Sequence, residues 1–180
     1  MTFEETGLPG VVIITPKIFR DSRGAFQETF NLRAIVAKGL PQNWAQDNFS
    51  ISKRHVLRGI HYQLTNPQGK LVRVTHGAVF DVAVDLRRSS AHFGKHVTVE
   101  LTGENGRILW IPEGFGHGFV VLSDVAGFAY KTTNYYAPDG ERTILWSDPD
   151  LGIRWPVREG VIVSEKDAMG KLFRDAEVFA

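Results

Sequence analysis

The stretch "AVFDVAVDL", residues 78–86, points most directly to the fold. Its side chains change character at every second position, which is typical of a β-strand because successive side chains point to opposite faces. One predicted face carries the bulky apolar residues Phe80, Val82, Val84 and Leu86. The other carries Asp81, Ala83 and Asp85. If that second face points inward, its carboxylates belong to a site; if it points outward, they are merely solvated.

Short runs of the same kind follow one another along most of the chain. The predicted strands are residues 11–15, 25–30, 56–63, 70–77, 78–86, 96–101, 107–111, 118–122, 127–133 and 143–146. Turn residues separate several of them, at "NPQG" 66–69, "TGENG" 102–106 and "APDG" 137–140. Short helices are expected at residues 31–40, ending at Gly39, and at residues 164–177. This pattern predicts an all-β sandwich or barrel, with a single domain over residues 1–180.

The composition narrows the function classes. A chain of 180 residues with 43% hydrophobic residues can bury the core of one domain. The net charge is only +1, and the lysines and arginines are scattered along the chain rather than clustered. No binding to nucleic acid is therefore expected. The absence of cysteine excludes disulfides, thiolate metal ligands and a cysteine nucleophile. No apolar run resembles a signal peptide or a membrane span, and we expect a cytoplasmic protein.

The stretch "VLRGIHYQ", residues 56–63, places two polar side chains in a strand with core character. Strict alternation would put Arg58 and His61 on opposite faces. A β-bulge at Gly59 would bring them to the same face, and glycine suits a bulge. His117 and Tyr130 lie in similar aromatic-rich strands. Each of these residues alone is compatible with a structural role, so only their combination indicates a site.

Metal binding is one possible use of the histidines, because the β-barrels called cupins bind metal through two histidine-bearing motifs. The second motif is present here, apart from Val121 in place of its closing asparagine: Gly106, Pro112, Gly114 and His117. The first motif keeps Gly59 and His61, but Gln63 replaces its second histidine, and Pro67 and Gln68 stand where its glutamate would fall. Two imidazoles without a carboxylate are a poor ligand set for a divalent metal. We therefore expect no metal and no other cofactor.

Six segments in series resemble the dTDP-4-dehydrorhamnose 3,5-epimerase family. They are "FRDSRGAFQETF" 19–30, "QDNFSIS" 46–52, residues 56–87, "IPEGFGHGFVVLS" 111–123, "YKTTNYYAPDGE" 130–141 and "SEKD" 164–167. The resemblance implies a metal-independent, cupin-like jelly roll (a double-stranded β-helix) with a few short helices, usually a homodimer. It also implies a nucleotide-linked 4-keto-6-deoxyhexose substrate, inverted at carbon 5 and usually also at carbon 3.

The resemblance assigns catalytic roles to four residues. His61 would be the general base, because imidazole titrates near neutral pH, and Asp167 would orient it. Asp167 has a rival role, since Ser164 and Asp167 have the spacing of a helix capping box; Asp81 is the reserve partner for His61. Lys70 would stabilise the enolate oxygen and Tyr130 would return the proton. His117 is expected to bind sugar hydroxyls or support the site rather than act as a second base.

The resemblance also assigns the contacts to the nucleotide-sugar. Arg23 and Arg58 suit phosphate recognition, because guanidinium binds phosphate in a bidentate manner. Tyr136 is expected to stack on the thymine, with Tyr135 as its near rival. Further ligand-contacting positions are Glu28, Gln46, Asn48, Glu141 and Lys166. Departures from the family pattern are Arg54, His55 and Gly116, and none removes a group that the chemistry needs.

The resemblance therefore implies an epimerase that converts dTDP-4-dehydro-6-deoxy-D-glucose to dTDP-4-dehydro-L-rhamnose. One alternative is an epimerase that inverts only carbon 3 or only carbon 5 of a related dTDP-4-keto-deoxysugar. Another is a non-catalytic cupin that binds a nucleotide-sugar, although such a protein would not need His61, Lys70, Tyr130 and Asp167 together. A metal-dependent cupin oxygenase or isomerase is disfavoured by Gln63.

Overall fold

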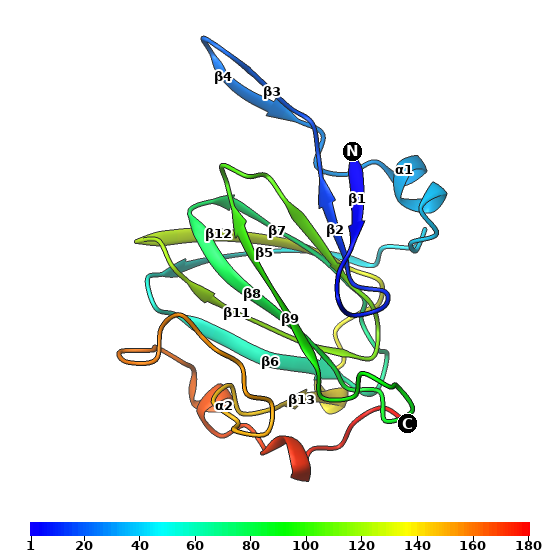
Figure 1. Ribbon diagram of the computed structural model, residues 1–180, viewed down its shortest axis with the longest axis vertical. Helices are drawn as coiled ribbons and strands as arrows, with labels where there is room; N and C mark the ends of the chain where they lie inside the picture. The colour runs from blue at the N-terminus through cyan, green and yellow to red at the C-terminus, as the bar shows by residue number, and fades with distance from the viewer.

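A computed structural model describes residues 1–180, and its regular structure is mostly antiparallel β-strand (Figure 1). The larger sheet has six strands in the order β1 (Thr2–Glu5), β2 (Val12–Thr15), β10 (Ile108–Ile111), β7 (Lys70–His76), β12 (Val125–Thr132) and β5 (Gln46–Lys53). The smaller has five, in the order β13 (Glu141–Thr143), β6 (Leu57–Gln63), β11 (Phe115–Val121), β8 (Ala78–Asp85) and β9 (His96–Thr102). The hairpin of β3 (Ile18–Asp21) and β4 (Gly24–Gln27) projects from the body (Figure 1).

The two large sheets face each other across the main hydrophobic core. Strand β8 shows how the sequence builds this arrangement. Val79 and Ala83 point inward to the core between the sheets, whereas Val82, Val84 and Leu86 point outward to a second core. The segment after β13 covers that outer face with Leu151, Ile153 and Trp155. The predicted alternation and the predicted all-β fold are both confirmed, and Asp81 belongs to the inward face.

Three strands were not predicted from the sequence. These are β1, β3 and β5. Strand β5, "QDNFSISK", is rich in residues that favour turns, yet it pairs along its whole length with β12, from Gln46 opposite Thr132 to Lys53 opposite Val125. It lies at the edge of its sheet, where polar residues are tolerated. The last predicted strand, residues 143–146, was misplaced, because the strand there is β13, which ends at Thr143.

One predicted helix is confirmed and the other is much shorter than predicted. Helix α1 (Leu32–Ala37) is capped by the Asn31 side chain and is followed by Gly39, whose φ of 84° suits a helix end. Helix α2 spans only Glu165–Ala168. After it the chain turns extended, since the Lys171 N–H donates to the Thr143 carbonyl and the Leu145 N–H donates to the Lys171 carbonyl. The chain also forms two short 3₁₀ helices, η1 (Pro138–Gly140) and η2 (Phe173–Asp175).

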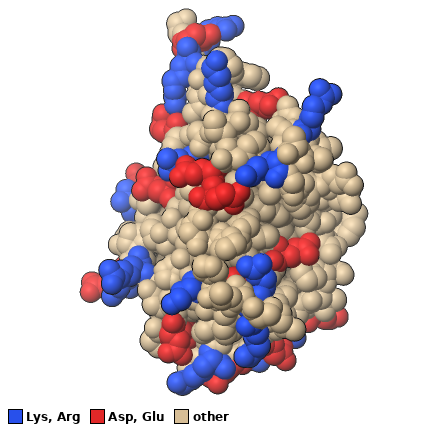
Figure 2. Space-filling model, turned by 45° about the vertical axis from the view of Figure 1, so that its right-hand side comes forward, with Lys and Arg blue, Asp and Glu red and all other residues tan.

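The molecular surface carries charges of both signs. On the face shown in Figure 2, acidic and basic side chains are interspersed among broad uncharged areas. None of the helices is long and apolar enough to cross a membrane.

Candidate active site

A cavity of about 330 Å³ lies between the two large sheets. Strands β5, β6, β7, β11 and β12 line it, together with the segment that leads into β13. It gathers most of the predicted site residues: Asn48, Arg58, His61, Lys70, His117, Tyr130, Tyr136 and Glu141. Residues far apart in the sequence therefore face one space.

A β-bulge in β6 brings Arg58 and His61 to this cavity. His61 pairs with His117 and Arg58 pairs with Phe119, so two residues of β6 stand opposite the single Gly118 of β11. Gly59 has a φ of 117°, and a Cβ there would lie 2.6 Å from the Gly118 Cα. Only glycine fits this close approach. The predicted bulge at Gly59 is confirmed.

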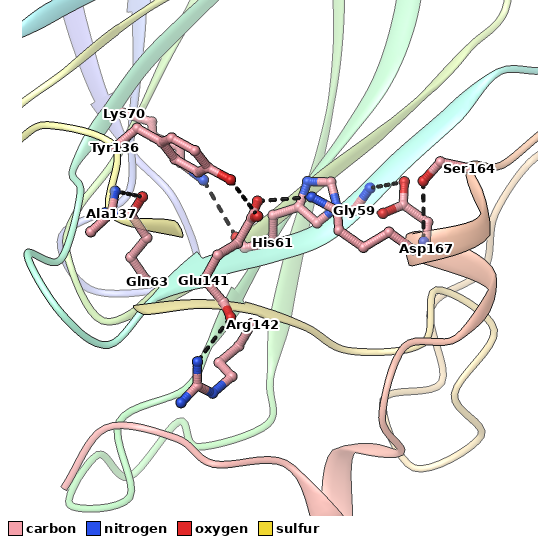
Figure 3. Close-up of polar contacts among 11 residues, drawn as sticks. Gly59, His61, Gln63, Lys70, Tyr136, Ala137, Glu141, Arg142, Ser164 and Asp167 are labelled. Atoms are coloured by element: carbon pink, nitrogen blue, oxygen red, sulfur yellow. Dashed lines mark hydrogen bonds and ion pairs between the residues drawn. The ribbon is translucent and has the colours of Figure 1, made fainter. Parts of the chain in front are cut away.

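His61 is hydrogen-bonded to Asp167 (Figure 3). The distance from His61 Nε2 to Asp167 Oδ1 is 2.5 Å, and the second carboxylate oxygen accepts a 3.4 Å hydrogen bond from the Gly59 N–H. Burial opposes ionisation of Asp167, but the hydrogen bond and charge of His61, the Gly59 N–H and the charge of Lys166 together outweigh it, and the pKa of this carboxyl lies below its usual value. An ionised Asp167 fixes the proton on Nε2, which leaves His61 Nδ1, without a partner in the chain, as the basic nitrogen.

Asp167 also has the capping role that was its rival assignment. The Asp167 N–H donates to the Ser164 Oγ at 3.1 Å, at the start of α2 (Figure 3). The two roles are compatible because the cap uses the backbone of Asp167 and the contact with His61 uses its side chain. The helix end thus holds the carboxylate in place.

His117 forms a second histidine–carboxylate pair. Its Nε2 lies 3.0 Å and 3.2 Å from the two carboxylate oxygens of Asp81, which is fully buried. The imidazole also stacks on Phe128, with ring centroids 5.9 Å apart. Asp81 is therefore not the partner of His61, and the reserve assignment was wrong. Each histidine has its own carboxylate.

Lys70 and Tyr130 bring two further proton-bearing groups into the cavity. Lys70 Nζ donates to the His61 carbonyl at 3.4 Å. Burial lowers the pKa of Lys70 to about 8, although the negative charges of Glu141 and Asp81 act in the opposite direction. Burial raises the pKa of Tyr130, partly opposed by the positive charge of Arg58. Near neutral pH the lysine is a cation and the phenol keeps its proton.

Tyr136 stands at the mouth of the cavity, held by Glu141. The Tyr136 hydroxyl donates to Glu141 Oε2 at 2.9 Å, and Lys166 Nζ donates to Oε1 at 2.9 Å (Figure 3 shows Tyr136 and Glu141). Burial opposes ionisation of Glu141, but these two hydrogen bonds hold its pKa below the usual value. Tyr135, the rival stacking residue, is exposed and does not line the cavity.

Two predicted ligand contacts lie away from the cavity. Arg23 is at the exposed end of the β3–β4 hairpin, where it pairs with Asp21 at 2.6 Å. Glu28 follows that hairpin, and its carboxylate accepts from Asn31 Nδ2 at 3.1 Å. This chain alone does not bring either residue to His61. Lys166 and Gln46 do not line the cavity themselves. Lys166 contacts the cavity residue Glu141, and Gln46 accepts a hydrogen bond from the backbone of Tyr136.

Several cavity residues were missed by the sequence reasoning. Gln63 was noted only as a substitute for a metal-ligating histidine, and Gln68 only as standing where a glutamate would fall, although both line the cavity. The apolar floor consists of Phe119 and Phe128, whose rings stack with centroids 4.1 Å apart. The alternation of β11 and β12 could have identified these aromatic residues as inward-pointing.

Comparison with known proteins identifies the family. A model of the dTDP-4-dehydrorhamnose 3,5-epimerase family matches residues 5–175. The chain belongs to this family. The epimerase of that name from Pseudomonas aeruginosa is 54% identical over 173 residues, which cover 96% of each chain. The resemblance seen in the sequence is confirmed.

Solved structures of related epimerases share the fold. The dTDP-6-deoxy-D-glucose-3,5-epimerase of Legionella pneumophila, solved with dTDP-4-keto-L-rhamnose, has a TM-score of 0.94 at 50% identity, covering 98% of this chain and 94% of that one. ChmJ, a 3'-monoepimerase from Streptomyces bikiniensis solved with dTDP-quinovose, has a TM-score of 0.88 at 33% identity, covering 94% and 86%. The cupin-like fold prediction is thereby confirmed, and these structural relatives include both a 3,5-epimerase and a 3'-monoepimerase.

Proposed function

We propose that the protein inverts carbons 3 and 5 of dTDP-4-dehydro-6-deoxy-D-glucose and so produces dTDP-4-dehydro-L-rhamnose. The observation that carries this proposal is the placement of His61 and Tyr130. His61 comes from β6 of the smaller sheet and Tyr130 from β12 of the larger sheet, and both line the same cavity. Inversion needs a base on one side of the sugar and an acid on the other, which two facing sheets supply.

The chemistry follows from the groups in the cavity. Carbons 3 and 5 flank the ketone at carbon 4, so their hydrogens are acidic. His61 Nδ1 takes one proton, and the electron pair of the C–H bond moves to the ketone oxygen as an enolate. Lys70 is a cation in the cavity wall and would stabilise that oxygen. Tyr130 then donates its phenolic proton to the opposite face of the same carbon, and exchange with solvent removes the proton from His61 and restores the phenol before the second inversion.

The nucleotide part of the substrate would occupy the mouth of the cavity. Arg58 has a single polar contact there, a 3.2 Å hydrogen bond to Ser52 Oγ, so its guanidinium can bind a phosphate. Tyr136 offers an aromatic face at the mouth, where 53% of the residue is exposed. A thymine stacked on Tyr136 would leave the diphosphate near Arg58 and the sugar near His61.

A homodimer is part of the same proposal. Large apolar side chains are exposed on the projecting hairpin and on the edge strand β5: Phe19, Phe26, Phe49 and Ile51. A second copy covering these side chains would remove apolar surface from water. In such a dimer, Arg23 and Glu28 of one copy would reach the cavity of the other copy, since both residues lie far from the cavity of their own chain. The cytoplasmic location stays a prediction.

Incubation with dTDP-4-keto-6-deoxyglucose in heavy water tests the function. We expect deuterium at both carbon 3 and carbon 5, and a product of L-configuration after reduction. Label at a single carbon would assign the protein to the single-position epimerases. No label, with dTDP binding retained, would indicate a non-catalytic binding protein. Exhaustive chelation before the assay is expected to leave the rate of exchange unchanged.

A further inference from the structure

The segment that carries Tyr136 crosses from one large sheet to the other. It leaves β12 after Thr132 and enters β13 at Glu141. An exposed aromatic residue on such a connection would ordinarily sample several orientations, and ordering it on ligand binding would cost affinity. Here, however, the backbone on both sides of Tyr136 is tied to the sheets by side chains.

Two glutamines accept hydrogen bonds from successive backbone amides of this segment. Gln46 Oε1 accepts from the Tyr136 N–H at 2.6 Å, and Gln63 Oε1 accepts from the Ala137 N–H at 3.0 Å (Figure 3 shows the latter). Gln46 belongs to β5 of the larger sheet and Gln63 to β6 of the smaller one. Each sheet therefore supplies one acceptor to the same short stretch.

Gln63 also fixes the neighbouring carbonyl groups. Its Nε2 donates to the Asn66 carbonyl at 2.9 Å and to the Tyr135 carbonyl at 3.2 Å. The side chain is almost fully buried, so both ends of its amide are paired with backbone. Gln63 thus joins the turn after β6 to the segment around Tyr136. These contacts give Gln63 a structural role at the position where metal-binding cupins have a histidine.

The hydroxyl of Tyr136 is held as well, by Glu141. The residue is consequently fixed at both ends, at its backbone by the two glutamines and at its ring by a carboxylate. A half-exposed ring with this many constraints is pre-organised as a platform for a flat ligand. Neither glutamine needs to contact the ligand for this effect.

We propose that Gln46 and Gln63 are positioning residues. They hold the Tyr136 ring in the orientation in which the base of the nucleotide can stack on it, a role that rests on the proposed function. Gln46 was expected from the sequence to contact the substrate, and its hydrogen bond to the Tyr136 N–H gives it a role that does not depend on such a contact. Loss of either glutamine should weaken dTDP binding by about three- to ten-fold, the size expected when one side chain must be ordered on binding. It should raise KM and leave kcat nearly unchanged, because the proton-transfer groups stay in place.

A double-mutant cycle tests this role. The affinity of dTDP is measured by titration calorimetry for the wild type and for Gln46→Ala, Gln63→Ala, Tyr136→Ala and each glutamine variant combined with Tyr136→Ala. We expect the glutamine substitutions to weaken binding in the wild-type background and to have no effect once Tyr136 is alanine. Gln42→Ala, at an exposed position, is the matched control and should bind like the wild type.

The outcomes separate this inference from the proposed function. If Gln46→Ala weakens binding equally with and without Tyr136, the glutamine contacts the nucleotide directly and the positioning role is overturned. If the wild type itself does not bind dTDP, the proposed function fails together with the inference. Thermal unfolding is measured for each variant. Should Gln63→Ala fail to fold, Gln46, which is only half-buried, carries the test alone.

Discussion

The carboxylate of Asp167 lies 2.5 Å from the imidazole of His61, although the two residues are 106 positions apart in the chain. A strand of the smaller sheet supplies the histidine and a four-residue helix near the C-terminus supplies the carboxylate. The backbone N–H groups of Gly59 and Asp167 complete the arrangement, one bonding the carboxylate and the other bonding Ser164. Tertiary contacts therefore fix the positions of both the base and the carboxylate that orients it.

Removing the charge of Asp167 should impair proton abstraction without weakening nucleotide binding. Asp167→Asn keeps the shape of the side chain but no longer favours the tautomer with a free Nδ1, and His61→Asn removes the base itself. We expect solvent-deuterium exchange to fall by about 10²–10⁴-fold in each variant, with the dTDP dissociation constant within a few-fold of the wild type. Exchange retained in His61→Asn would show that another group is the base.

Tyr130→Phe should separate proton abstraction from inversion. The variant lacks the phenolic proton but keeps the aromatic ring, so His61 can still remove a proton and return it to the same face. We expect deuterium to enter the recovered substrate while formation of the L-configured product falls steeply. Nuclear magnetic resonance of the recovered sugar measures both. Equal losses of exchange and inversion would mean that Tyr130 has a structural role only.

The rate should fall at alkaline pH because Lys70 loses its charge. Its pKa is about 8 in the folded protein, and the form that stabilises an enolate is the protonated one. We expect kcat/KM to decline as pH rises through about 8, since this parameter reports the free enzyme. The negative charge of Glu141 raises the pKa of Lys70, so Glu141→Gln should move the decline to lower pH.

Two further variants control this pH profile. Lys70→Arg carries a charge that does not titrate in this range and should remove the decline, whatever its effect on the maximal rate. Glu165→Gln changes an exposed carboxylate on α2 and should leave the profile unchanged. If kcat/KM still declined at alkaline pH in Lys70→Arg, a group other than Lys70 would be responsible for the decline.

Gly59→Ala should destabilise the protein and displace His61. A Cβ at Gly59 would lie 2.6 Å from both the Gly118 Cα and the His117 carbonyl oxygen, at a φ of 117°. Strain at such a position costs on the order of 1–3 kcal/mol before any displacement of β11. Gly39→Ala is the matched control, because Gly39 also has a positive φ but nothing within 4 Å of an added Cβ. Chemical denaturation should show a larger loss of unfolding free energy for Gly59→Ala. Equal losses would mean that the bulge tolerates a side chain.

Local patterns in the sequence determined most of the strands, one helix and the set of candidate groups. The alternation of residues 78–86 identified β8 and its two faces, and Gly39 marked the end of α1. Gly59 between Arg58 and His61 was enough to predict the bulge. These features depend on neighbouring residues, whose side chains and backbone preferences act over a few positions.

Only the tertiary structure decided which polar groups meet. Asp81 and Asp167 were both candidates for His61, and the choice came from packing that places Asp81 against His117. The early end of α2 and the edge strand β5 also depended on distant partners, because Lys171 pairs with the backbone of Thr143 and Leu145 and β5 pairs with β12. Buried polar groups take whichever partner the folded chain brings within about 3 Å. That distance depends on long-range contacts, which no local pattern encodes.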